Sequence, residues 1–178
     1  MYKMFFYERY ILRIVILIDI IRFMGESDMG KPSKEQIHKN MRNIKGQDTS
    51  IEVILRKELW KRGYRYRKNY KKLDGKPDIV LVKYKIAIFC DSEFWHGKDW
   101  GELRARLEKG SNPDYWIKKI SRNMERDDIV NKKLQMQGWS VIRFCGRDIV
   151  KNTDECIRSI EEIIFDNKIG EVFYGDDY

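Results

Sequence analysis

Two apolar runs rich in β-branched residues lie in the middle of the chain, separated only by a short polar turn. The first run is "PDIVLV" (residues 77–82), the second is "KIAIFC" (residues 85–90), and the turn falls at Lys83–Lys85. Runs of this length and composition are typical of buried strands, and a short connection suits antiparallel neighbours. The pattern predicts a β-hairpin, so the rest of the fold has to be arranged around a sheet.

Helical periodicity is found on both sides of this predicted hairpin. Apolar residues recur at helical spacing after candidate capping residues at 48–50, and again in segments beyond the hairpin. We predict helices at 33–44, 51–63, 113–137 and 153–165, and further strands at 64–69 and 139–144. This order of elements predicts an α/β fold with a mixed β-sheet flanked by helices. The length of 178 residues suits a single domain.

The most apolar stretch, residues 4–24, contains five charged side chains and is too polar for a membrane-spanning helix. It also lacks the small-residue cleavage site of a secretory signal. Three interpretations stay open: a helix packed on the domain, a helix that binds a partner, or a leader translated from an upstream start. We favour the leader, with Met24 or Met29 as the usual first residue. The predicted divisions are an apolar extension (1–29), a domain (30–168) and a tail (169–178).

The chain carries a net charge of +8, and all of this surplus lies in residues 30–178. A basic surface favours a polyanionic partner, because each phosphate neutralised by Lys or Arg releases condensed counterions. The segment 56–72 holds nine basic residues, one acid and three interleaved tyrosines. This mixture suits a nucleic-acid backbone, although a solvated strand edge protected by lysines explains it equally well. The three cysteines form no CxxC pair, which favours a reducing, cytoplasmic setting.

Two aspartates stand at the ends of the predicted hairpin strands. Asp78 begins the first strand and Asp91 ends the second, so an antiparallel hairpin brings the two positions to the same edge. Carboxylates that converge at a sheet edge form a site for a hard cation such as Mg²⁺, which prefers oxygen ligands and keeps several waters. Aspartates are also common in turns for purely structural reasons.

The segment "DSEFWHG" (residues 91–97) concentrates an acid, an imidazole and two aromatic rings. An exposed pair such as Phe94 and Trp95 can wedge between base steps of a duplex, whereas core aromatics beneath a loop are the plainer interpretation. His96 is one of only two histidines. Glu52, in the first turn of a predicted helix, is either a surface acid that favours the helix dipole or a carboxylate aimed at metal-bound water.

The chain resembles the very short patch repair (Vsr) DNA mismatch endonucleases, a branch of the PD-(D/E)xK nuclease superfamily. The resemblance covers residues 36–165, excludes 1–29, and implies a restriction-endonuclease-like mixed sheet flanked by helices. The ordered matching blocks are "NMRNIKGQDTSIE" (40–52), "GKPDIV" (75–80), "FCDSEFWHG" (89–97), "YWIKKISRNMERD" (115–127) and "LQMQGWSVIRF" (134–144).

The resemblance implies roles for four residues in phosphodiester hydrolysis. Asp78 matches the family's Mg²⁺-binding aspartate, and the backbone carbonyl of Cys90 matches a second metal ligand. Glu52 matches a glutamate that contacts metal-bound water. His96 matches a histidine that acts near the attacking water.

The resemblance also implies roles in DNA recognition. Phe94, Trp95 and Met41 match residues that intercalate beside the mismatch, and Lys119 and Asn123 match DNA-contacting residues of a long helix. Double-stranded DNA is therefore the expected partner, together with mismatch-repair or DNA methyltransferase-linked proteins. No membrane partner is expected.

Two departures from the family pattern are visible. Asp91 stands where well-known members place a histidine, so we expect Asp91 to bind the metal directly or to hold its water. Those members also carry a structural zinc ion, and at the corresponding places this chain has neither a thiolate nor an imidazole. We therefore predict no structural zinc and expect packing or ion pairs to hold the basic loop 98–111. The residues at those places are Glu93, Lys98, Trp100 and Arg147.

The expected activity is Mg²⁺-dependent hydrolysis that nicks one strand beside a T·G mismatch. Two alternatives stay open. One is a restriction-type endonuclease with the same active site that cuts unmethylated or foreign DNA. The other is a non-catalytic DNA-binding module whose acidic residues are structural.

Overall fold

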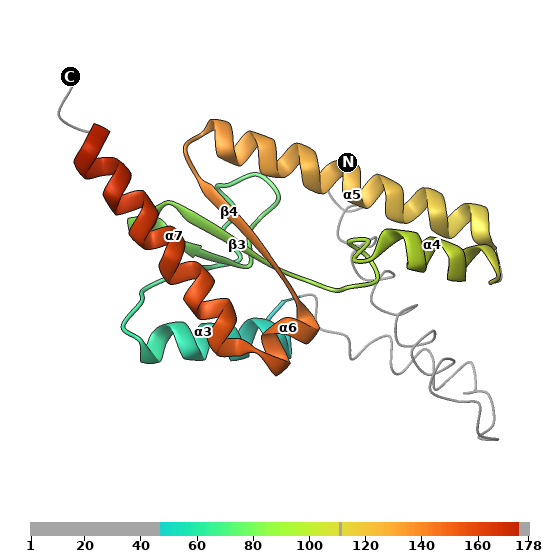
Figure 1. Cartoon of the computed structure of the whole chain (residues 1–178), viewed down its shortest axis with the longest axis horizontal. Coiled ribbons are helices and arrows are strands. Elements are labelled where there is room, and N and C mark those ends of the chain that lie inside the picture. The colour runs from blue at the N-terminus through green and yellow to red at the C-terminus, as the bar shows by residue number, and fades with distance from the viewer. Residues whose placement is uncertain (1–46, 111, 175–178) are drawn as a thin grey trace. The chain divides into compact units, whose positions relative to one another are not determined.

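The computed structural model describes residues 47–110 and 112–174. The chain divides into two units, Met1–Thr49 and Ser50–Tyr178, and every helix and strand labelled in Figure 1 belongs to the second. The predicted extension 1–29, the predicted helix 33–44 and Met41 lie outside the described residues.

The predicted hairpin is present. Its strands are β2 (Ile79–Leu81) and β3 (Ile86–Asp91), which pair antiparallel and are buried along their whole length. A short 3₁₀ helix, η1 (Val82–Tyr84), and Lys85 in the left-handed conformation make the turn between them. The apolar runs thus form the strands that the sequence predicts, and the polar residues form the connection.

Two further strands complete a mixed sheet with the order β1-β2-β3-β4. β1 (Arg67–Lys68) pairs antiparallel with β2 and is much shorter than the strand predicted at 64–69. β4 (Ser140–Cys145) runs parallel to β3. The predicted α/β class with a mixed sheet flanked by helices is therefore confirmed.

The alternating side chains of β3 divide the core into two clusters. Ile86, Ile88 and Cys90 contribute to the larger cluster on one face of the sheet. Ala87 and Phe89 contribute to a smaller cluster on the other face, with Leu134 of the long helix. The same period of two holds at the last residue of the strand, Asp91, and directs its side chain toward the face of the smaller cluster.

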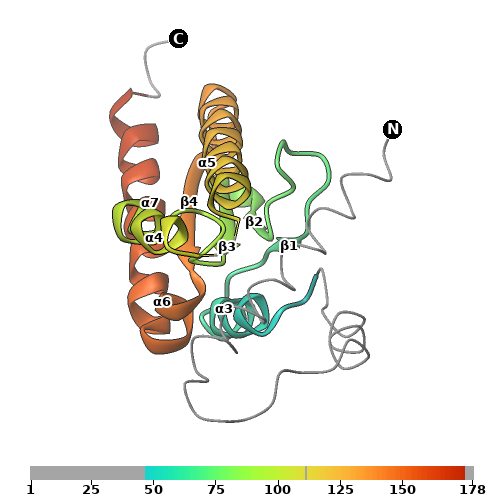
Figure 2. The same ribbon diagram turned by 90° about the vertical axis from the view of Figure 1, so that its right-hand side faces the viewer.

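Helices cover both faces of the sheet (Figures 1 and 2). α3 (Ser50–Lys61), α6 (Gly146–Lys151) and α7 (Thr153–Tyr174) pack together with the larger cluster, and α5 (Pro113–Met136) covers the opposite face. α7 continues past the predicted end at residue 165. Within residues 47–110 and 112–174, every helix is too short or too polar to span a lipid bilayer.

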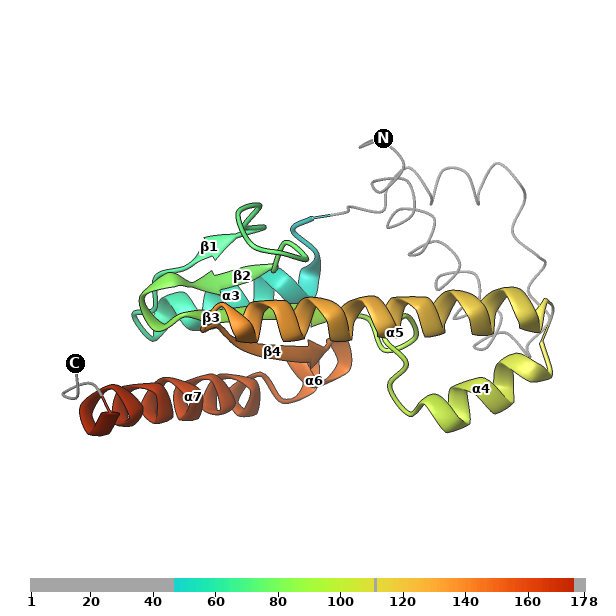
Figure 3. The ribbon, with the colours of Figure 1, turned by 90° about the horizontal axis from the view of Figure 1, so that it is seen from above.

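Two helices were not predicted, α6 and α4 (Trp100–Glu108). α4 occupies most of the segment predicted as a basic loop, so that prediction is wrong. Leu103 and Leu107, one helical turn apart, are its buried residues, and this spacing was a detectable signal. α4 packs against the N-terminal half of α5 where α5 continues past the sheet (Figure 3).

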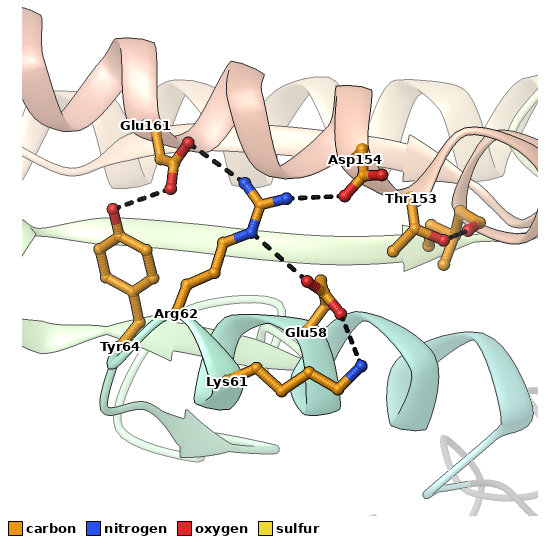
Figure 4. Close-up of polar contacts among 8 residues, drawn as sticks. Glu58, Lys61, Arg62, Tyr64, Thr153, Asp154 and Glu161 are labelled. Carbon is orange, nitrogen blue, oxygen red and sulfur yellow. Dashed lines mark hydrogen bonds and ion pairs between the residues drawn. The ribbon is translucent and has the colours of Figure 1, made fainter.

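An arginine joins α3 to α7 through three carboxylates (Figure 4). Arg62 Nη2 lies 2.6 Å from Asp154, and its Nη1 and Nε lie 3.4 Å from Glu161 and Glu58 respectively. The hydroxyl of Tyr64 donates a further hydrogen bond of 3.2 Å to Glu161. The network ties α3 to the C-terminal helix α7.

We expect Arg62→Met to lower the melting temperature by about 2–4 °C, because surface ion pairs are weak singly but this guanidinium serves three of them. Thermal unfolding followed by circular dichroism measures the change. The difference should shrink in 1 M salt, where exposed charges are screened. Lys61→Met, which removes a single exposed pair with Glu58, is the matched control and should change the melting temperature less.

Candidate active site

The edge at which β2 begins and β3 ends gathers the predicted acidic residues. Asp78 directly precedes β2 and is buried. Its Oδ2 accepts a hydrogen bond of 2.9 Å from the backbone N–H of Cys90. The carboxylate is therefore fixed beside the last residues of β3, as the hairpin geometry predicts.

Glu52 and Asp91 lie close to the same strand end. Glu52 is only 1% exposed, so the surface-acid interpretation is wrong, and it pairs with Arg56 at 3.7 Å. Burial raises the pKa of the Cys90 thiol, and the charges of Asp78, Glu52 and Asp91 raise it further. The thiol therefore stays protonated at neutral pH, which leaves the backbone carbonyl as the oxygen that Cys90 can offer a hard cation.

His96 lies between two carboxylates that come from different elements. Its Nε2 is 3.4 Å from Asp91 Oδ1 at the end of β3, and its Nδ1 makes a short contact with Asp127 Oδ2 of α5. Burial alone would raise the pKa of Asp127, but the hydrogen bond from His96 and the charges of His96, Arg143 and Arg126 outweigh it and lower that pKa. Asp127 is therefore an anion at neutral pH and can orient the imidazole.

Two members of this group were missed in the sequence, Asp127 and Arg143. Arg143 lies in β4 and donates from Nη1 to Asp91 Oδ2 at 2.7 Å, while its Nη2 is 3.4 Å from Asp127 Oδ1. A charged residue inside the apolar run 139–144 was one available signal. The spacing of Asp127 four residues after Asn123 on one helix face was another.

The aromatic residues of the 91–97 segment pack against the start of α5. Trp95 is 2% exposed, and its ring lies 4.8 Å from that of Phe94 and 5.8 Å from that of Trp116, between ring centroids. In this structure Trp95 is thus a core aromatic beneath a loop, and Phe94 is partly exposed. Their intercalation stays a prediction that requires Trp95 to leave this packing.

The two predicted DNA-contacting residues of α5 differ in exposure. The Lys119 side chain is partly exposed beside Tyr115, whose hydroxyl lies 3.5 Å from its Nζ. Asn123 is only 8% exposed, and its Nδ2 has no hydrogen-bond partner within the described residues. Lys119 can reach a phosphate directly, whereas Asn123 needs a ligand that enters between α5 and its neighbours.

Ion pairs tie the His96 segment to α6. Glu93 pairs with Arg147 at 2.8 Å, and Lys98 pairs with Asp148 at 2.8 Å. The expectation that packing or ion pairs hold this region is confirmed, since Leu103 and Leu107 are also buried. The absence of a structural zinc ion stays a prediction.

Gly97 is favoured by its backbone conformation, and a side chain there would also crowd Met124. Its φ is +65°, and a Cβ added there would collide with the sulfur of Met124. We expect Gly97→Ala to destabilise the protein by about 1–3 kcal/mol and to displace the neighbouring His96, which lowers nicking. Chemical denaturation and a nicking assay measure the two effects. Gly63→Ala is the matched control, because Gly63 has a φ of +85° but nothing within 4 Å of the added Cβ.

The oxygen ligands available at this site suit Mg²⁺ better than a metal ion that needs a full set of side-chain ligands. No three His, Cys, Asp or Glu side chains among residues 47–110 and 112–174 are arranged to hold a metal ion. A cation here would depend on Asp78, the Cys90 carbonyl and water molecules. Mg²⁺ is commonly bound in this way, by one or two carboxylates and retained waters.

A mixed sheet flanked by helices, with carboxylates and a histidine gathered at the end of its central hairpin, defines an α/β nuclease. A family model described as "DNA mismatch endonuclease Vsr" matches residues 28–102. The chain belongs to the Vsr DNA mismatch endonuclease family and is a DNA endonuclease.

Relatives support this assignment over most of their length. Type II nicking enzyme V.HpaIIP of Haemophilus parainfluenzae is 45% identical over 139 residues, 78% of this chain and 97% of the relative. Type II nicking enzyme V.NmeDIP of Neisseria meningitidis serogroup C is 42% identical over 140 residues, which are 79% of this chain and 93% of the relative. DNA mismatch endonuclease Vsr of Escherichia coli (strain K12) is 35% identical over 124 residues, which are 67% of this chain and 76% of the relative.

Proposed function

We propose that the chain nicks one strand of duplex DNA beside a T·G mismatch by Mg²⁺-dependent phosphodiester hydrolysis. One observation carries the proposal: His96, held between two carboxylates, adjoins the strand end at which Asp78 is bonded to Cys90. The site therefore offers a proton acceptor next to oxygen ligands. These are the two components that metal-assisted hydrolysis needs.

Asp78 and the backbone carbonyl of Cys90 would hold the metal ion. When bound, Mg²⁺ supplies Lewis-acid stabilisation of the phosphate and lowers the pKa of bound water. Asp91 was expected to join this set or to hold its water. Its two oxygens face His96 and Arg143, so we assign it to the support of His96.

His96 would accept the proton of the attacking water. Asp127 accepts the Nδ1 hydrogen, which leaves Nε2 as the ring nitrogen on the side of Asp91 and the strand end. A general base needs this kind of orientation, because the correct ring nitrogen has to carry the lone pair. Glu52, buried at the start of α3, would help to orient the water.

Substrate choice would follow from the ease with which DNA is deformed. A T·G mismatch is held less firmly than a paired step, so a wedge of Phe94 and Trp95, with Met41, meets less resistance there. Lys119 and Asn123 of α5 would contact the duplex. The names of the relatives, two nicking enzymes and one mismatch endonuclease, support cleavage of a single strand.

A nicking assay tests the proposal. The purified chain is incubated with a labelled duplex that carries one T·G mismatch, or with its fully paired counterpart, in Mg²⁺ or in EDTA. We expect one strand of the mismatched duplex to be cut, only in Mg²⁺. Equal cutting of both duplexes would instead favour the restriction-type alternative, and cutting in EDTA would refute the assigned cofactor.

A further inference from the structure

Arg143 is the one cation that contacts both carboxylates flanking His96 in the described structure. Its Nη1 lies 2.7 Å from Asp91 and its Nη2 lies 3.4 Å from Asp127. Its Nε donates a hydrogen bond of 3.0 Å to the side-chain oxygen of Asn131. The guanidinium therefore links the end of β3 to two positions of α5, from a strand that contributes no other side chain to the candidate site.

The surroundings of Arg143 suit an arginine and no other cation. The guanidinium carbon lies 4.1 Å from the ring centroid of Phe89, so the planar group stacks on an aromatic face. Its fork presents separate N–H groups to carboxylates on two elements, which the single ammonium of a lysine cannot do. The side chain is mostly buried, where a charge is tolerated only if it is paired.

Two other roles for Arg143 fit the geometry poorly. Each of its three nitrogens already faces a protein partner and the side chain is mostly buried, so the guanidinium is poorly placed to bind a phosphate. It also lies two residues before the strand end, since Arg143 pairs with Phe89 in the sheet and Cys145 pairs with Asp91. What it does contact are the two anions that contact His96.

We infer that Arg143 is a positioning residue of the hydrolytic reaction, one that acts through Asp91 and Asp127 on His96. The guanidinium fixes both carboxylates, and the carboxylates fix the plane and the tautomer of the imidazole. Without the fork, two negative charges would face each other across the ring, and one of them would turn away. This inference rests on the proposed role of His96 as the base.

The first test observes the imidazole itself and does not depend on activity. The chain has two histidines, so the ring ¹⁵N signals of His96 can be assigned with His38→Gln. We expect Arg143→Met and Arg143→Lys to shift these signals and change the tautomer ratio. Arg158→Met, which removes a positive charge from the exposed side of α7, should leave them unchanged. Unchanged His96 signals in folded Arg143→Lys would overturn the inference.

The second test separates chemistry from binding. Single-turnover nicking of the T·G duplex should fall about 10- to 100-fold in Arg143→Lys, with duplex affinity near that of the wild type and a lower melting temperature that still leaves the chain folded at the assay temperature. In an Asp91→Asn background, Arg143→Lys should lower the nicking rate by a smaller factor, because the contact by which Arg143 acts on Asp91 is already weakened. Losses of nicking rate that are fully additive in free energy, or a wild-type rate in Arg143→Lys, would refute the inference that Arg143 positions His96. If Arg143→Met does not fold, Arg143→Lys decides.

Failure of the proposed function would look different. If the wild-type chain does not nick the mismatched duplex, the assigned activity is wrong. The ring signals of His96 still decide whether Arg143 positions the imidazole, because they are recorded without DNA.

Discussion

Asp78→Ala is expected to lower the single-turnover rate of nicking by about 10³-fold or more, while affinity for the duplex stays within about twofold. The rate falls because the substitution removes the carboxylate proposed as the metal ligand, an effect of several kcal/mol on the transition state. The affinity persists because it comes from the basic surface and not from the strand edge. Rapid-quench nicking and a filter-binding titration of the same duplex measure the two quantities.

Two companion variants make this result interpretable. Asp78→Asn keeps an oxygen that can accept the N–H of Cys90 but removes the charge, so it should lose activity as severely as Asp78→Ala and remain more stable. Asp74→Ala removes an exposed acid from the same loop and should nick like the wild type. A wild-type rate in Asp78→Ala, or an equal loss in Asp74→Ala, would show that the assigned carboxylate is not the reacting one.

The hairpin and its acidic edge could be predicted because they follow from local rules. Apolar runs fix β2 and β3, and the period of two along β3 places Cys90 and Asp91 on opposite faces. The antiparallel pairing then brings Asp78 to the end of the partner strand. No contact between distant elements enters this argument, which is why it succeeded.

The support of His96 could not be predicted in the same way. Asp127 and Arg143 reach the imidazole only because α5 crosses one face of the sheet and β4 pairs parallel to β3. Sequence spacing can single out Asp127 as a candidate, but it carries no information on that crossing. For Trp95 the sequence left open whether the ring is available for DNA or belongs to the core, and packing against Trp116 buries it in this structure.

His96→Ala is expected to reduce the single-turnover nicking rate by about 10²- to 10⁴-fold, the range for loss of a general base. Binding of the mismatched duplex should change little, because the ring contacts carboxylates and not a basic surface. Asp91 and Asp127 keep Arg143 as a shared partner, so the fold should survive the loss of the imidazole. Nicking under single-turnover conditions and a parallel binding titration measure these effects.

The dependence of His96 on Asp127 gives this prediction its sharpest control. Asp127→Asn should slow nicking through misorientation of the ring, and combining it with His96→Ala should add almost nothing, because residues that act as a unit are not additive. His38→Ala removes the other histidine and should leave the rate unchanged. If the two losses multiply instead, Asp127 acts on the reaction by a route of its own, and the proton acceptor would have to be sought among the remaining carboxylates, Glu52 first.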